Sequence, residues 1–98
     1  MAAYMIAYQK IDDPVFEDEY NAGAIALLEK HGGEIVALGQ PILLEGDEPL
    51  SDVAAIVRFP DVQSVNAFCN DPEYAPLIAL RDRHSKTRMT AIDASAEA

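Results

Sequence analysis

The strongest constraint on the fold is a pair of short segments that are apolar at nearly every position. Residues 4–9 read Tyr-Met-Ile-Ala-Tyr-Gln, and residues 53–59 read Val-Ala-Ala-Ile-Val-Arg-Phe. Successive side chains of a strand point to opposite faces of its sheet, so strands of this kind need cover on both faces. Any fold for this chain therefore has to bury two sides of one sheet.

The remaining segments complete a β-α-β-β-α-β order. Further strands are predicted at residues 34–38 and 87–93, with a bend or bulge at 39–41 and resumed strand structure at 42–45. Helices are predicted at 14–30 and, in two segments broken near 70–72, from 62 to 84. With right-handed crossovers this order gives an α+β, ferredoxin-like fold, a four-stranded antiparallel sheet with helices on one face. One domain spans residues 1–93, and residues 94–98 are expected to form a frayed tail.

Local signals support both helices. Asp13 followed by Pro14 is typical of a helix start, because the Asp side chain accepts an unpaired N–H and Pro has none. Gly32 and Gly33 predict the end of the first helix. Pro76 indicates that the last helix begins after residue 71 or is kinked, since a Pro beyond the first turn removes a backbone hydrogen bond. At helical spacing, the inner faces are predicted to be Phe16, Tyr20, Ala24, Leu27 and Leu28 in the first helix and Tyr74, Leu77, Ile78 and Arg81 in the last.

The two apolar segments become the central strands of this sheet, and the helices can cover only one of its faces. The other face needs a different cover. Closed two-fold dimers are the commonest oligomers, so a second copy packing sheet to sheet is the preferred interpretation. The alternative is a monomer whose open face is rich in small Ala side chains and tolerates exposure.

The charge balance limits the classes of partner. The chain has 17 acidic and 7 basic residues, a formal net charge of -10. Nucleic-acid binding depends mainly on Lys and Arg neutralising phosphates, so no nucleic-acid partner is expected. No apolar run approaches the roughly 20 residues that a membrane-spanning helix needs, and no signal peptide is recognisable, which predicts a cytoplasmic protein without a membrane partner. A single cysteine, Cys69, excludes an internal disulfide and a Cys-based zinc site.

The chain resembles the bacterial "domain of unknown function 1330" family, within the dimeric α/β-barrel superfamily, over nearly its whole length. The resemblance rests on the order and spacing of residues 4–8, Asp13-Pro14, Tyr20, His31-Gly32-Gly33, Leu44-Glu45-Gly46, Phe59-Pro60, Pro72-Glu73-Tyr74 and Arg81. It implies the fold, a sheet-to-sheet homodimer and a cleft between sheet and helices, and it implies no activity. Relatives in the superfamily include cofactor-independent monooxygenases, haem-degrading enzymes, lactone isomerases and non-catalytic dimers. Phe68-Cys69 stands where the family usually has a Trp-Tyr pair, so the ligand preference of relatives does not transfer directly.

Arg81 is the most informative candidate site residue. Its helical phase puts it on the buried side of its helix, and a buried guanidinium needs a partner. One interpretation is a structural ion pair with Glu45, a pair of positions to which the resemblance also points. The other is that Arg81 binds a ligand carboxylate or enolate through its planar fork.

The other candidates have weaker signals. Tyr74 and Tyr20 lie on inner helix faces and are either ligand donors or core aromatics with their hydroxyls at the rim. His84 is either a general acid or base or a cation that complements the end of its helix. His31 has the same structural interpretation, and Cys69 reads as a small buried side chain. No metal-ligand spacing and no Gly-rich phosphate loop is present, so neither a metal nor a cofactor is predicted.

Two hypotheses follow. The first is a homodimeric domain that binds a small anionic or aromatic molecule between sheet and helices, with the further possibility of a cofactor-independent enzyme. The second is a non-catalytic dimeric structural or interaction module in which the same residues only stabilise the fold.

Overall fold

The computed structural model describes residues 2–47 and 51–94. The elements follow in the order β1 (Ala3–Ile11), the 3-10 helix η1 (Pro14–Phe16), α1 (Glu17–Lys30), β2 (Glu34–Gly39), β3 (Val53–Phe59), α2 (Val62–Cys69), α3 (Ala75–His84) and β4 (Ser85–Asp93). This is the predicted β-α-β-β-α-β order, with the last helical region divided in two. Of the predicted tail 94–98, only Ala94 lies within the described residues.

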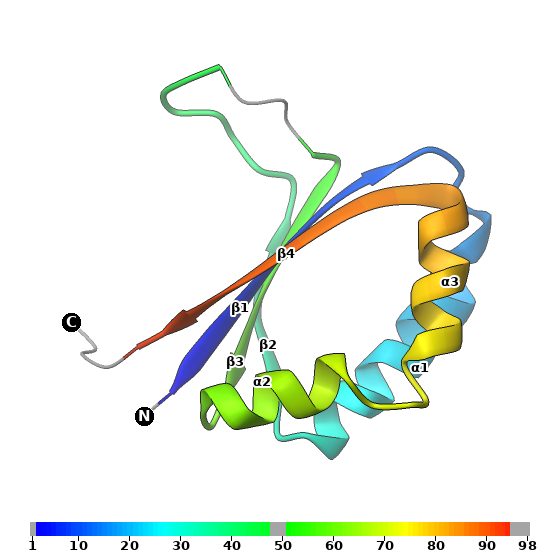
Figure 1. The fold of residues 1–98 in the computed structure, drawn as a ribbon. Helices are drawn as coiled ribbons and strands as arrows, with labels where there is room; N and C mark the ends of the chain where they lie inside the picture. Colours follow the sequence, from blue (N-terminus) through cyan, green and yellow to red (C-terminus); the bar gives the residue numbers. More distant parts are fainter. Residues whose placement is uncertain (1, 48–50, 95–98) are drawn as a thin grey trace.

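The strands form one antiparallel sheet in the order β2-β3-β1-β4. All three neighbouring pairs are antiparallel, and β1 and β3 occupy the centre as predicted. Figure 1 shows the helices gathered on one side of the sheet, and no helix of the described residues covers its other side. The α+β, ferredoxin-like fold is therefore confirmed.

The start and end of α1 follow from its predicted signals. Asp13 Oδ1 accepts a hydrogen bond from the backbone N–H of Val15 at 3.1 Å, and Pro14 opens the 3-10 turn that leads into the helix. At the other end Gly32 has φ of 78°, in the left-handed region where a side chain is disfavoured. The N–H of Gly33 returns to the carbonyl of Leu28 at 2.7 Å and so satisfies one of the last helical carbonyls.

The second helical region begins and restarts at aspartates. Asp61 caps α2 by accepting a hydrogen bond from the backbone N–H of Ser64 at 2.7 Å. Asp71 accepts from the N–H of Glu73 at 2.9 Å in the turn before α3. Because α3 begins at Ala75, Pro76 falls in its first turn, where no backbone hydrogen bond is lost. Of the two predicted alternatives, the late start is therefore the one observed.

Two predictions about β2 are wrong. The irregularity in its pairing lies between Ile35 and Ala37, where the register with β3 shifts, and not at residues 39–41. Residues 42–45 form no strand. They have strand-like apolar side chains, but the chain leaves the sheet after Gly39, and Pro41 lacks the N–H that a continuing ladder needs.

The core lies between the sheet and the helices. Tyr74, Phe16, Phe59 and Phe68 are its largest fully buried side chains. Phe68 packs against Tyr74 with ring centroids 4.5 Å apart, and against Phe59 at 5.9 Å. The part of the chain that the structure describes has no helix long and apolar enough to cross a membrane.

Candidate functional site

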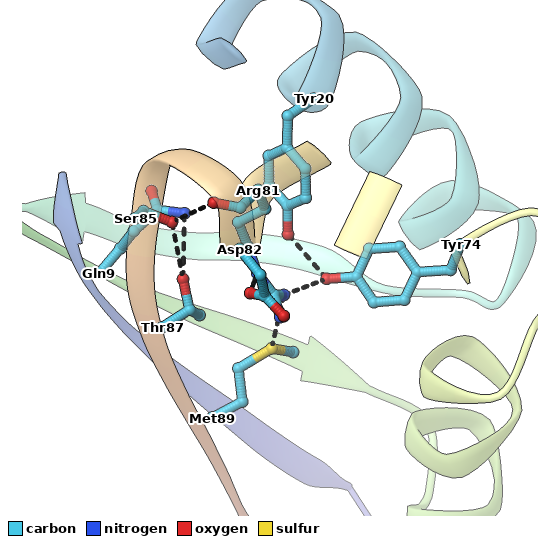
Figure 2. Close-up of polar contacts among 8 residues, drawn as sticks. All are labelled: Gln9, Tyr20, Tyr74, Arg81, Asp82, Ser85, Thr87 and Met89. Atoms are coloured by element: carbon cyan, nitrogen blue, oxygen red, sulfur yellow. Dashed lines mark hydrogen bonds and ion pairs between the residues drawn. The ribbon is translucent and has the colours of Figure 1, made fainter. Parts of the chain in front are cut away.

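Arg81 lies in the last turn of α3 and is 7% exposed. Its Nε donates to Asp82 Oδ1 at 3.0 Å, and its Nη1 donates to the hydroxyl of Tyr74 at 3.1 Å. Nη1 also lies 3.6 Å from Met89 Sδ on β4 (Figure 2). Among the described residues no hydrogen bond is found for Nη2, whereas each edge of the guanidinium fork already has one donor in use, through Nε or Nη1.

Glu45 is not among these partners, so the predicted Arg81–Glu45 ion pair is wrong within the subunit. Glu45 is an exposed residue of the connection between β2 and β3, which extends away from the helices (Figure 1). Arg81 is instead satisfied by its sequence neighbour Asp82 and by Tyr74. A buried cation can be satisfied by neutral hydroxyl and thioether groups together with one carboxylate, an arrangement that charge alone does not predict.

Tyr20 and Tyr74 meet at Arg81. Their hydroxyl oxygens are 2.7 Å apart, and the Arg81 guanidinium carbon lies 5.9 Å from the centre of the Tyr20 ring. Burial raises the pKa of Tyr74 far above its ordinary value, and the neighbouring Tyr20 adds to this, while Arg81 opposes it only partly. Tyr74 is therefore a neutral phenol throughout the physiological range. The candidates Tyr20, Tyr74 and Arg81 form one cluster, which we call the tyrosine–arginine cluster.

The sheet contributes a polar strip that faces this cluster. Gln9 Nε2 donates to Thr87 Oγ1 at 3.3 Å, and Ser85 Oγ donates to the carbonyl of Arg81 at 2.8 Å. Figure 2 shows these side chains and Met89 lying near Arg81. None of these side chains was predicted as a site residue from the sequence. Ser85, Thr87 and Met89 alternate along the strand, and this spacing could have placed them on one face. Because the strand was predicted to begin only at residue 87, Ser85 was left out of it.

The helices cover this face of the sheet unevenly. At one end Ala3, Met5, Val57 and Phe59 are buried. Toward the other end Ser85 is buried beside α3, but most side chains on the same face are only partly buried, namely Ala7, Gln9, Val53, Ala55, Thr87 and Met89. Met89 pairs with Ala7 in the register, so Arg81 lies at the boundary between the covered and the half-covered parts.

The two histidines lie apart from one another and outside the cluster. The ring of His84 stacks on Phe16 with centroids 5.9 Å apart and 10° between their planes, and its carbonyl accepts hydrogen bonds from the N–H groups of Asp12 and Asp13. His31 Nε2 lies 2.8 Å from Asp71 Oδ2. The described residues contain no group of three or more His, Cys, Asp or Glu side chains that could hold a metal ion.

Asp71 is a buried acid. From the sequence it was predicted only as part of the break between the two helical segments. Its Oδ2 is 2.8 Å from His31 Nε2 and 2.9 Å from Lys30 Nζ, and its Oδ1 accepts from the N–H of Glu73. These hydrogen bonds hold the pKa of Asp71 well below its usual range, with His31 first, then Lys30 and the Glu73 N–H. The contacts join the end of α1 to the turn before α3, which positions Tyr74.

Cys69 is half-buried beside the core, and burial raises the pKa of its thiol, with only partial opposition from Arg81. Phe68 is 1% exposed and contacts Tyr74 from the core side. A separate cavity of about 410 Å³ lies between α1 and α3, with a wall formed by Gly23, Leu27 and Leu77. No residue of the tyrosine–arginine cluster lines it.

The family model "Domain of unknown function (DUF1330)" matches residues 2–95. The chain belongs to this family. The resemblance drawn from the sequence is thereby confirmed. No curated protein matches the chain.

Solved structures share the fold at low sequence identity. The protein of unknown function RPA0582 from Rhodopseudomonas palustris superimposes with a TM-score of 0.77 at 18% identity, over 98% of this chain and 84% of that one. The cofactor-independent oxygenase SnoaB from Streptomyces nogalater gives 0.68 at 13% identity, over 98% and 95%. A dimeric ferredoxin-like protein of unknown function from Bacteroides fragilis gives 0.62 at 14%, over 94% and 95%. At these identities the shared property is the fold.

Proposed function

We propose that this chain is a homodimeric domain that binds a small, planar, anionic organic molecule at the half-covered part of its sheet. The single observation that carries this is the tyrosine–arginine cluster, in which the Nη2 group of a buried guanidinium has no described hydrogen-bond partner beside a half-covered strip. An Arg fork matches a carboxylate or enolate in geometry as well as in charge. The aromatic rings and the thioether of Met89 supply the apolar walls that small-molecule sites usually have.

The chemistry of the cluster supports binding more directly than it supports catalysis. Tyr74 stays protonated, so it can donate or accept a hydrogen bond but does not act as a base near neutral pH. The imidazole of His84, the other candidate for acid–base work, stacks on Phe16, and none of the described hydrogen bonds of Arg81 involves it. SnoaB is a cofactor-independent oxygenase with this fold, and a reaction of that kind here would need a proton acceptor supplied by the ligand itself.

The open face of the sheet supports the homodimer. Tyr4, Ile6, Tyr8, Ile56 and Ile92 lie on that face by their register, and Ile92 is 53% exposed. A contiguous apolar face of this kind marks an interface in soluble proteins. Neighbours from Bacteroides fragilis and Jannaschia with the same fold are dimeric. Sedimentation of the full chain should give a dimer at micromolar concentration, and a stable monomer would contradict this half of the proposal.

Ligand binding is tested by thermal unfolding with 4-hydroxybenzoate and salicylate, using the uncharged 4-hydroxybenzamide as the matched control. Binding to the folded state at about 100 times Kd stabilises a protein by about 2.7 kcal/mol. For a domain of this size, each kcal/mol raises Tm by about 4–8 °C. We expect the acids to raise Tm and the amide to leave it unchanged. The absence of any shift across a panel of aromatic and aliphatic acids would favour the structural-module alternative.

Two substitutions test whether Arg81 is the residue that binds the acid. Arg81→Lys keeps the charge and removes the planar fork, so it should weaken acid binding at least about tenfold while the protein stays folded. Arg83→Gln removes a cation from the exposed side of the same helix and should bind as the wild type does. Unchanged binding by folded Arg81→Lys would show that the fork does not hold the ligand.

A further inference from the structure

The connection between β2 and β3 carries an exposed apolar segment that ends in acids. We call residues 40–47 the arm. Within it, Ile42 is 81% exposed and Leu44 is 92% exposed. Glu45 and Asp47 follow, on either side of Gly46, whose φ of 93° turns the chain. Figure 1 shows the arm leaving the sheet on the side away from the helices. Apolar side chains this exposed indicate a surface that is covered by something else.

The open face of the sheet is basic at the end where the arm begins. Of the 7 Lys and Arg residues, four lie on this face by their register, Lys10, Lys86 and Arg88 at this end and Arg58 at the other. Lys10 and Lys86 are exposed and directly opposite one another on β1 and β4. Like charges in opposed positions repel, and among the described residues neither ammonium forms an ion pair. In a chain of net charge -10, this pair is a local site for a carboxylate.

The strand register gives the position of the arm relative to the Lys10–Lys86 pair. Gly39, the last residue of β2, is in the same cross-strand row as Ala54, Tyr8 and Arg88. The Lys10–Lys86 pair lies in the next row of the same face. The arm therefore starts at the β2 edge, while the basic pair lies toward the β4 edge, at the same end of the sheet.

When their strands are aligned, two sheets can pack face to face about a two-fold axis in two ways. If the axis runs along the strands, the β2 edge of each sheet faces the β4 edge of the other, with matching ends together. The arm then lies over the second copy's Lys10–Lys86 pair. If the axis runs across the strands, the ends are reversed and the arm lies over the second copy's Glu34 and its register partner Arg58, whose charges offset each other. Electrostatic complementarity favours the first arrangement.

The separation of packed sheets and the length of the arm permit the first arrangement. Packed sheets are about 10 Å apart, and residues 40–47 can span roughly 26 Å when extended. We propose that the arm of each subunit lies across the β4 edge of a second copy, where Glu45 and Asp47 neutralise the Lys10–Lys86 pair and Ile42 and Leu44 are buried. This rests on the proposed homodimer and does not depend on a ligand.

Cross-linking of the full chain distinguishes the two arrangements. In a Cys69→Ala background, the pair Glu45→Cys and Lys86→Cys is treated with a short bismaleimide, and the pair Glu45→Cys and Glu34→Cys serves as the comparison. We expect the first pair to give a covalent dimer on a denaturing gel and the second to give little. The proposal is overturned if the second pair cross-links instead, if the first pair links within one subunit, or if neither links in a protein that sedimentation shows to be dimeric.

Charge reversal supplies an independent readout. Glu45→Lys and Lys86→Glu should each weaken dimerisation about tenfold or more at low salt, and the double variant should restore most of it. Glu29→Lys with Arg83→Glu places the same charge changes on the exposed helix surface and should leave the dimer constant unchanged. Additive losses in the Glu45–Lys86 double variant would contradict the contact. A monomer in sedimentation would contradict the homodimer and with it this inference. Failure of the organic acids to bind would contradict only the proposed ligand site.

Discussion

The hydroxyl oxygens of Tyr20 and Tyr74 lie 2.7 Å apart, and Nη1 of Arg81 donates to the second of them at 3.1 Å. Because the Tyr74 oxygen accepts from Arg81, its own proton is available for Tyr20. One buried phenol thus links α1 to α3 and satisfies part of a buried cation. This arrangement makes Tyr74 the residue on which both the stability and the proposed binding function of the cluster depend.

Tyr74→Phe should therefore destabilise the protein although it removes only one oxygen atom. Arg81 loses an acceptor in a place that water reaches poorly, and leaving a buried polar group unpaired costs about 1–3 kcal/mol. Urea unfolding followed by circular dichroism measures the loss. Gln63→Ala, at an exposed position of α2 away from the sheet, is the control and should change the free energy of unfolding by less than about 0.5 kcal/mol. Equal effects of the two substitutions would show that the Tyr74 hydroxyl has no special role.

Asp71 should make stability depend on pH in the acid range. Its hydrogen bonds to His31, Lys30 and the Glu73 N–H lower its pKa in the folded state, so the stabilisation is fully present above the pKa of an unfolded Asp, about 3.9. It is lost as the pH falls below that value, because the unfolded chain then binds a proton that the folded protein excludes.

The test compares urea unfolding of the wild type and Asp71→Asn between pH 3 and pH 7. We expect the variant to be less stable at pH 7 and to lose less stability on acidification than the wild type. Asp18→Asn, on the exposed side of α1, should follow the wild-type curve. Parallel curves for the wild type and Asp71→Asn would mean that Asp71 titrates normally in the folded protein.

Cys69 should react slowly with thiol reagents while the protein is folded. Burial raises the pKa of the thiol, and the thiolate is the reactive form. With Ellman's reagent at neutral pH, the folded chain should react about tenfold or more slowly than the chain unfolded in urea. Asn66→Cys in a Cys69→Ala background presents an exposed thiol on the same helix and should react at the unfolded rate. Rapid labelling of native Cys69 would show that the space beside the core is open to reagents.

The sequence predicted the fold well because its strongest signals were periodic. The apolar central strands, the Asp13-Pro14 helix start and the Gly32 stop are each set by neighbouring residues, and all three are found in the structure. The strand predicted at 42–45 is absent, because strand-like composition does not show whether a partner strand lies alongside.

The site was predicted only in part. Helical phase placed Tyr20, Tyr74 and Arg81 on inner faces, and the structure brings those three together. Helical phase could not identify Met89 and Ser85 as contacts of Arg81, because those contacts depend on how α3 meets β4. Glu45 was predicted from its charge and from the family resemblance, whereas Asp82 and the Tyr74 hydroxyl accept hydrogen bonds from the guanidinium within the subunit.

Gly32 ends α1 in a backbone conformation that a side chain opposes, so Gly32→Ala should destabilise the protein. Its φ is 78°, and a Cβ atom there would approach Cγ of Pro60 to 3.1 Å. The left-handed conformation alone costs a non-glycine residue about 1–2 kcal/mol, and the contact with Pro60 adds to it. Gly39→Ala at the end of β2 is the matched control, since its φ is not positive and a Cβ there would meet nothing within 4 Å. Urea unfolding should show a clear loss for the first substitution and none for the second. A Gly32→Ala protein as stable as the wild type would contradict the requirement for glycine at this turn.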